Sequence, residues 1–241
     1  MANKFLSFIT LLVFLFSLGA VPAWSGEDES IAKELTILLK ASRAVLVQNK
    51  PLIKNPKGAG IGVDKFLSLT YANYEKATGK KFKMGGGNMG KAQGMLIEAI
   101  KGVVGDVVSG KDTALDPKGR FLPAIFARKA ATRFGKTSGG KMYLKLTTQD
   151  KFLVNPSNKA DGWEKGVIEG KFLKAGWEKG KTFSEMAKHN GKNAFRLILP
   201  EYFKKGCMGC HGGDNGAKIH PGKVGGSVGE LGGAISVAIY K

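Results

Sequence analysis

Apolar residues recur at helical spacing through most of the first half of the chain. Ser30 offers an N-cap for the first of these segments, and Gly79 is placed to end the second in the left-handed conformation. Glycine clusters separate ordered elements and are typical of loops. The pattern predicts helices over residues 31–49, 64–78, 91–109 and 123–134.

The pattern changes in the second half of the chain. Residues 141–148 alternate between apolar and polar side chains, which is typical of a half-buried strand, and the apolar runs 194–199 and 234–240 are also expected as strands. Before these runs, Asp161-Gly162-Trp163-Glu164 has the form of a capping box, which predicts a helix through about Leu173. Helices followed by strands indicate an α+β fold, and the lack of a clear linker favours a single domain.

The first 25 residues have the composition of a secretory signal. Lys4 supplies a positive charge, and residues 5–18 form an apolar run that small residues follow. The run is shorter than the roughly 20 residues that a membrane span needs, although an uncleaved anchor is the alternative. We therefore expect a signal peptide over residues 1–25 and a mature domain over 26–241, located in the periplasm or elsewhere outside the cytoplasm. After cleavage the protein is not expected to be an integral membrane protein.

Positive charge dominates the composition. Lys and Arg number 38 against 19 Asp and Glu, a formal net charge of +19. The lysines are spread along the chain without a nucleic-acid-binding motif, so nucleic acid is not an expected partner. Association with acidic proteins or an anionic membrane face suits this charge better, although a generally solvated basic surface would explain it equally well. Four lysines flank a cysteine motif in the sequence and are candidates for a docking ring: Lys204, Lys205, Lys218 and Lys223.

That motif, Cys207-Met208-Gly209-Cys210-His211, has the spacing of a c-type haem attachment site. Two thiols three residues apart can each reach one haem vinyl group, and the histidine that follows is then held beneath the iron. A CxxC disulfide catalyst does not need that histidine, and a structural zinc site normally needs four nitrogen or sulfur ligands. The motif predicts one covalent haem c, with Cys207 and Cys210 as thioether anchors and His211 as the proximal ligand of the iron.

Several further segments occur in the same order in a known family. They are Pro123-Ala124-Ile125-Phe126, Asn155-Pro156, Asp161-Gly162-Trp163-Glu164, Phe195-Arg196, Pro200-Glu201-Tyr202 and Gly232-Gly233-Ala234-Ile235-Ser236-Val237. On these residues and the cysteine motif, the chain resembles the single-haem c-type cytochromes with a PAS-like fold. Members of that family occur as stand-alone exported proteins and as extracytoplasmic sensor regions of signalling proteins.

The resemblance implies an antiparallel sheet flanked by helices, with a PAS-like core over about residues 121–241 and the haem between sheet and helices. Family members can use a cysteine thiolate as the second axial ligand, but both cysteines of this chain are assigned to haem attachment. The side chains left as candidates for the distal ligand are His220, His189 and a methionine among Met84, Met89, Met95, Met142 and Met186, of which Met142 and Met95 are carried forward. A neutral lysine as the distal ligand, or no distal ligand, would also fit.

Each of these candidates has an ordinary structural alternative. His220 lies in a glycine-rich segment and would otherwise be an exposed loop residue, and His189 is expected near a helix end. Met95 and Met142 fall on apolar faces, where core packing is the usual role. Arg196 and Trp163 are candidates for contacts with a haem propionate or the haem pocket, with packing as the alternative for Trp163.

Three classes of function follow from these features. The first is a periplasmic electron carrier with an acidic redox partner. The second is a haem-based sensor of redox state or of NO, CO or O2, which would act with a separate membrane-bound signalling partner. An enzyme is not expected, because no acid–base pair of histidine and carboxylate stands out and the thiols would be blocked by haem. Binding of CO to the reduced protein separates the first two.

Overall fold

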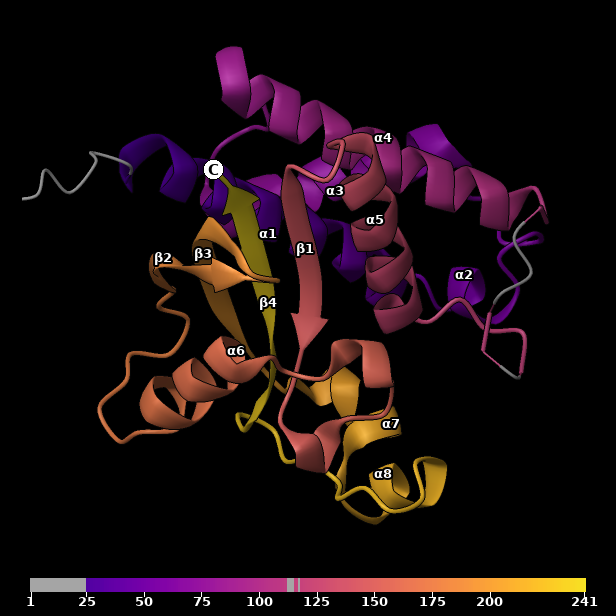
Figure 1. Ribbon diagram of the computed structural model, residues 1–241. Helices are drawn as coiled ribbons and strands as arrows, with labels where there is room; N and C mark the ends of the chain where they lie inside the picture. The colour runs from indigo at the N-terminus through magenta and orange to yellow at the C-terminus, as the bar shows by residue number, and fades with distance from the viewer. Residues whose placement is uncertain (1–24, 112–114, 117) are drawn as a thin grey trace, which may run out of the picture.

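A computed structural model describes residues 25–111, 115–116 and 118–241. The fold is α+β: the N-terminal half is helical, and a four-stranded antiparallel sheet follows in a PAS-like arrangement with flanking helices (Figure 1). The helices are α1 (Ser25–Gln48), α2 (Lys50–Lys54), α3 (Val63–Thr78), α4 (Gly87–Val108), α5 (Pro123–Thr137), α6 (Gly162–Val167), α7 (Met208–His211) and α8 (Gly213–Ile219). The strands are β1 (Met142–Thr147), β2 (Phe183–His189), β3 (Lys192–Tyr202) and β4 (Leu231–Tyr240).

The sheet has the order β1-β4-β3-β2, so the last strand in sequence lies inside it. Val237 of β4 pairs with Leu144 of β1 on one side and with Leu197 of β3 on the other. These three side chains are buried in one hydrophobic cluster with residues of α1, α4 and α5. The helical half therefore covers one face of the sheet.

The opposite face of the sheet carries smaller and more polar side chains. Lys145, Ser236 and Ile198 share a row across β1, β4 and β3 on this face. A second hydrophobic cluster, which includes Ile198 and Phe172, packs here beneath α6 and the π-turn that continues it from Ile168 to Phe172. The two faces thus have different chemistry, apolar toward the large helices and mixed toward α6.

Several predicted elements are confirmed together with their end signals. Gly79 ends α3 with a φ of 70°, and its N–H donates to the carbonyl of Glu75 at 2.8 Å. Asp161 and Glu164 form the reciprocal hydrogen bonds of a capping box at the start of α6. The predicted strands at 141–148, 194–199 and 234–240 correspond to β1, β3 and β4.

Two predictions about element ends are wrong. Ser30 is not an N-cap, because α1 already begins at Ser25 and the Ser30 hydroxyl donates to the carbonyl of Gly26 within the helix. His189 does not lie at a helix end but closes β2, where it pairs with Lys192 of β3. Asn190, with a φ of 51°, and Gly191, with a φ of 78°, form the two-residue turn between these strands. Asn-Gly is the strongest short-range hairpin signal in a sequence, and it predicts this turn.

The predicted signal peptide, residues 1–25, lies outside the described residues apart from Ser25. Within residues 25–241, leaving aside positions 112–114 and 117, no helix has both the length and the apolar character needed to cross a bilayer.

Candidate functional site

The cysteine motif lies on two short helical turns beyond the end of β3. A 3-10 turn, Lys205–Cys207, leads directly into α7, which contains Cys210 and His211. Residues three apart on a helical turn lie on the same side, so the two cysteines can face a common partner. Both thiols are free and partly exposed. The motif therefore presents two free thiols and an imidazole within one compact segment.

The ring of His211 lies between two other rings. Its centre is 5.6 Å from that of Phe203, with 23° between the planes, and 5.6 Å from that of His220, with 27° between the planes. Phe203 is held in turn by an edge-on contact with Phe152 at 5.1 Å. Burial lowers the pKa of His211, and the nearby charges of His220 and Arg43 lower it further. Burial and the charge of Arg120 likewise lower the pKa of His220. Both rings are therefore held toward the neutral form, which can coordinate a metal.

Residues 212–226 fold back onto the motif. The N–H of Gly226 donates to the carbonyl of His211 at 2.5 Å, and the N–H of Gly213 donates to the carbonyl of Gly226 at 3.2 Å. A Cβ at position 225 would lie 1.9 Å from the carbonyl oxygen of Gly213, and one at position 226 would lie 2.2 Å from the ring of Phe203. The glycines permit a close approach of the two backbone segments that any other residue would block.

Two arginines from the helical half of the chain lie close enough to the cysteine motif and its loop for their charges to act on the histidines there. Arg43 of α1 forms an ion pair with Glu201 at the end of β3, and its Nε is buried without a hydrogen-bond partner among the described residues. Burial would raise the pKa of Glu201, but Arg43, with the charges of Lys40 and Lys204, holds it below its usual value. The hydrogen bond and charge of Arg43 thus fix the carboxylate, while one donor of its guanidinium remains unused.

Arg120 is the second of these arginines. Its Nε donates to Asp116 at 2.7 Å. This contact raises the pKa of Arg120, with a smaller contribution from the charge of Cys210. The sequence did not single out Arg43 or Arg120, because they approach the motif only through the packing of α1 and of the loop before α5.

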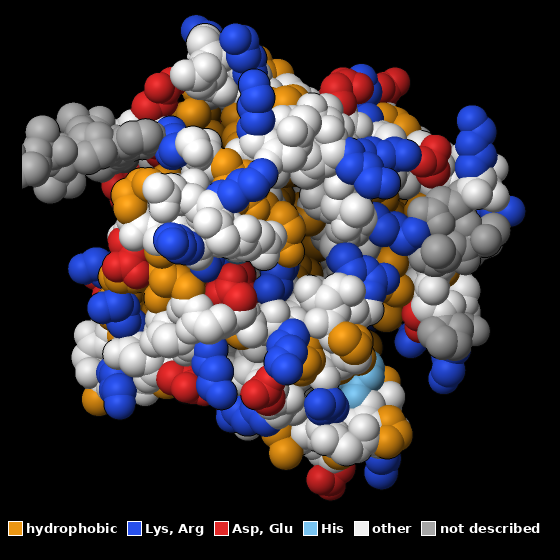
Figure 2. Space-filling view, viewed as in Figure 1, with side chains coloured by type: hydrophobic (Ala, Val, Ile, Leu, Met, Phe, Trp, Pro, Cys, Tyr) orange, Lys and Arg blue, Asp and Glu red, His pale blue; other side chains and the backbone are white. Residues whose placement is uncertain are grey.

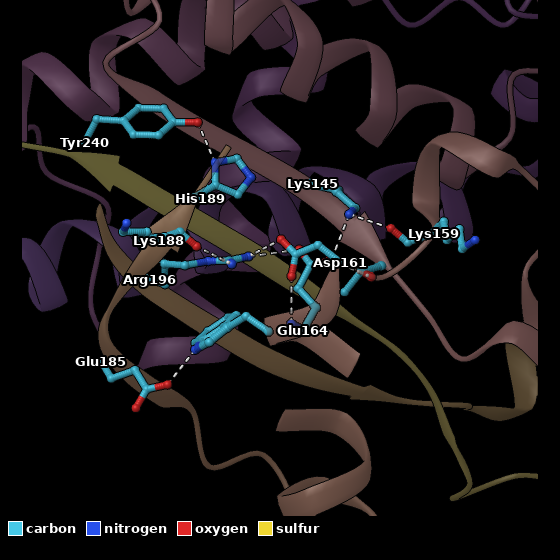
Figure 3. Close-up of polar contacts among 11 residues, drawn as sticks. Lys145, Lys159, Asp161, Glu164, Glu185, Lys188, His189, Arg196 and Tyr240 are labelled. Atoms are coloured by element: carbon cyan, nitrogen blue, oxygen red, sulfur yellow. Dashed lines mark hydrogen bonds and ion pairs between the residues drawn. The ribbon is translucent and has the colours of Figure 1, made fainter. Parts of the chain in front are cut away.

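The structure places Arg196 and Trp163 in a different cluster, on the face of the sheet beneath α6 (Figure 3). Arg196 is 1% exposed and its Nη2 donates to the carboxylate of Asp161 at 2.6 Å. Its guanidinium also lies over the ring of Trp163, 4.1 Å from the centre, and near the fully buried carboxylate of Glu164. No contact in the structure brings Arg196 or Trp163 to the cysteine motif, where they were expected to contact a haem propionate or the haem pocket.

The same cluster extends to Lys145 and His189 (Figure 3). Lys145 donates to Glu164 at 2.8 Å and to the carbonyl of Lys159 at 2.7 Å. The ring of His189 is buried and its Nδ1 is hydrogen-bonded to the hydroxyl of Tyr240. Burial lowers the pKa of His189, and the charge of Arg196 lowers it further. This network ties α6 to three strands.

The two methionine candidates are also placed elsewhere. Met95 of α4 and Met142 of β1 are partly buried and pack against the main hydrophobic cluster. Of the four candidates for the distal ligand, only His220 contacts His211. Among the described residues, no three His, Cys, Asp or Glu side chains are gathered closely enough to hold a metal ion by themselves.

The surface around the motif is basic and partly apolar. Lys204, Lys205 and Lys218 are exposed, as are the apolar side chains of Ile219 and Val224. We call the segment of residues 203–226 the motif lobe. Figure 2 shows a histidine at the surface of this lobe, bordered by hydrophobic side chains with Lys or Arg side chains nearby. The motif is therefore accessible to a partner that carries negative charge.

A separate groove of about 650 Å³ lies between α5 and the free edge of β1. Arg128, Lys136 and Tyr143 are among its lining residues, and none of residues 203–226 lines it. The groove and the cysteine motif are therefore different features of the surface.

Comparison with family models gives one match over most of the chain. The Tll0287-like family model matches residues 33–239, which include both halves of the fold and the cysteine motif. The chain belongs to the Tll0287-like family. Searches of the curated proteins and of the solved structures found no match.

Proposed function

We propose that this member of the Tll0287-like family is an exported monohaem c-type cytochrome that transfers electrons in the periplasm or another space outside the cytoplasm. The observation that carries the proposal is the arrangement of Cys207, Cys210 and His211 on consecutive helical turns. Both thiols are free, and the imidazole is held between two aromatic rings.

The residues around the motif fit a haem. Haem attachment requires two thiols and an adjacent imidazole, which is the donor set present here. Arg43 has a buried guanidinium donor without a partner among the described residues, and a propionate would satisfy it. The glycine-packed segment 212–226 forms a closely fitted support beneath His211.

Each group has a definite task in this proposal. The Cys207 and Cys210 thiols would add across the two vinyl groups, so that each S–H hydrogen would move to carbon and no atom would be lost. The His211 imidazole would hold the iron, and Arg43 and Arg120 would hold the propionates. The haem supplies a one-electron couple between ferric and ferrous iron. Phe203 fixes the plane of the His211 ring.

An acidic redox protein is the partner that this surface favours. Lys204, Lys205 and Lys218 are exposed close to the motif in a chain of net charge +19. Long-range attraction would raise the rate of encounter with an acidic partner at low salt. Charged residues of the partner would meet the lysines while its redox centre approached the apolar side chains.

The PAS-like fold favours a second candidate, a haem-based sensor of redox state or of NO, CO or O2. Such a module would act with a separate membrane-bound signalling partner. Exposure of the reduced protein to CO distinguishes the two. A large Soret shift would favour the sensor, and an unchanged spectrum would favour the carrier.

Mass spectrometry of the exported protein tests haem attachment directly. We expect a mass higher than that of the mature polypeptide by about 616 Da, the mass of one haem added without loss of atoms. Cys207→Ser and Cys210→Ser should each lose one thioether, and the double variant should lose the adduct completely. Met208→Leu, which changes a residue between the cysteines, is the matched control and should keep the adduct. A wild-type protein without the adduct would overturn the proposal.

A further inference from the structure

His211 and His220 stand at nearly the separation that a shared iron requires. Their ring centres are 5.6 Å apart. An iron bound by two axial imidazole nitrogens, at about 2 Å from each, keeps the two ring centres about 6 Å apart. To make both metal bonds, the two rings would have to move apart by a few tenths of an ångström with the porphyrin plane between them.

The nitrogens of these two rings are available for coordination. Within the part of the chain that the structure describes, neither ring takes part in a hydrogen bond, and their contacts are with other rings. His189 differs, because its Nδ1 is engaged with the hydroxyl of Tyr240. Of the three histidines, only His211 and His220 contact each other and have ring nitrogens that no hydrogen bond in the described part of the chain engages.

The backbone holds His220 in this position. Its N–H donates to the carbonyl of Gly216 at 2.9 Å at the end of α8, and its carbonyl accepts from the N–H of Lys223 at 3.0 Å. The segment then returns to His211, where the N–H of Gly226 donates to the carbonyl of that residue. Hydrogen bonds on both sides of His220 therefore hold its backbone in a defined position relative to that of His211.

We propose that His220 is the sixth ligand of the haem iron, opposite His211. The inference rests on the proposed haem attachment and goes further, because it assigns the second axial ligand. In the family that the chain resembles, a cysteine thiolate can fill that position. Two axial imidazoles fill both open positions of the iron. The expected protein is low-spin in both oxidation states, and its iron is closed to CO. Its potential should also be lower than that of a variant with methionine at position 220.

The wild-type protein with attached haem provides the first test. We expect near-infrared magnetic circular dichroism of the ferric protein to show the charge-transfer band of bis-imidazole ligation, and the ferrous spectrum to be unchanged under CO. This measurement needs no substitution, so it does not depend on how well a variant folds. A five-coordinate spectrum, or a band typical of methionine, lysine or thiolate ligation, would overturn the assignment.

Substitution of His220 provides the second test. His220→Ala should keep the covalent adduct, become high-spin, and bind CO to an extent at least about ten-fold greater than the wild type, because one iron position is opened. Free imidazole should restore the low-spin spectrum. His220→Met should remain six-coordinate with a higher potential. His189→Gln is the matched control, and its spectrum should be that of the wild type.

The outcomes separate this inference from the proposed function. If haem is attached and His220→Ala keeps the wild-type spectrum, His220 only stacks against His211 and the inference fails while the proposed function stands. If the wild-type protein carries no haem adduct, the proposed function itself fails, and the inference fails with it.

Discussion

The three histidines of the chain lie in two different surroundings. His189 is buried at the end of β2 and shares its Nδ1 with a tyrosine hydroxyl, whereas His211 and His220 face each other in the motif lobe. The pKa of each is lowered, with burial as the largest cause. A single residue type thus serves as a structural hydrogen-bond partner at one place and forms the proposed pair of iron ligands at the other.

A pH dependence of stability follows for His189. Its pKa is lower in the folded chain than in the unfolded chain, so unfolding takes up a proton at acidic pH. The free energy of unfolding should fall as the pH drops below about 6.5, the usual value for histidine. His189→Gln lacks this contribution, so the stability advantage of the wild type over the variant should shrink between about pH 7.5 and about pH 5. Urea unfolding at a series of pH values measures it, and a constant advantage would contradict the expectation.

Arg196 gives a prediction about buried charge. Its replacement in Arg196→Gln removes a cation that lies beside Asp161 and the fully buried Glu164. Asp161 would lose its ion-pair partner, and the buried Glu164 would keep Lys145 but lose its second cation, so the free energy of unfolding should fall by about 3 kcal/mol. Urea unfolding measures the change. Lys101→Gln, which breaks an exposed ion pair with Glu98, is the control and should leave stability unchanged. Equal changes in the free energy of unfolding for the two substitutions would show that the ion pairs of Arg196 do not stabilise the packing of α6 on the sheet.

At the scale of elements, sequence patterns identified those with strong local signals. α3 and its Gly79 cap were predictable, and so were the capping box of α6 and the strands β1, β3 and β4. β2 was missed because its exposed edge mixes polar and apolar residues, although Asn190-Gly191 signals the hairpin. Arg43 was missed because only packing of α1 against the end of β3 brings it to Glu201. Caps and strand patterns can be predicted from neighbouring residues in the sequence, whereas contacts between distant elements depend on the whole fold.

The loop that follows the motif gives a prediction of its own. Gly225→Ala would place a methyl group 1.9 Å from the carbonyl oxygen of Gly213, so the two backbone segments must separate. We expect a loss of about 2 kcal/mol in stability and, in the protein with the proposed haem attached, a partial loss of low-spin character. Thermal unfolding and absorption spectra measure these effects. Gly209→Ala, where a Cβ meets nothing within 4 Å, is the matched control. Unchanged spectra and stability in Gly225→Ala would argue against a tightly closed loop.

At the scale of the whole molecule, charge governs how the protein meets other molecules. The net charge of +19 acts at long range and weakens with added salt, whereas the lysines beside the motif act only on a partner that approaches there. The overall field and this local patch can be separated by changing the net charge by the same amount at two different places.

Two triple variants make that separation. Reversing Lys204, Lys205 and Lys218 to glutamate should slow electron exchange with ferricyanide, an anion, by about ten-fold at low ionic strength. The matched control reverses Lys80, Lys81 and Lys83, which are exposed outside the motif lobe, and alters the net charge equally. Stopped-flow rates at several salt concentrations measure both. Equal slowing in the two variants would mean that net charge, and not the patch beside the motif, determines the rate.

The central position of β4 has a consequence for the order of events after synthesis. β4 pairs with both β1 and β3, yet it follows the cysteine motif in the chain. Until residues 231–240 have emerged, β1 and the β2–β3 hairpin have no strand to join them, and the hydrophobic face toward α1 stays incomplete. If the chain is exported as proposed, the two thiols would reach the outer compartment ahead of the strand that completes the sheet, so a maturation enzyme would meet them on a chain that is still open.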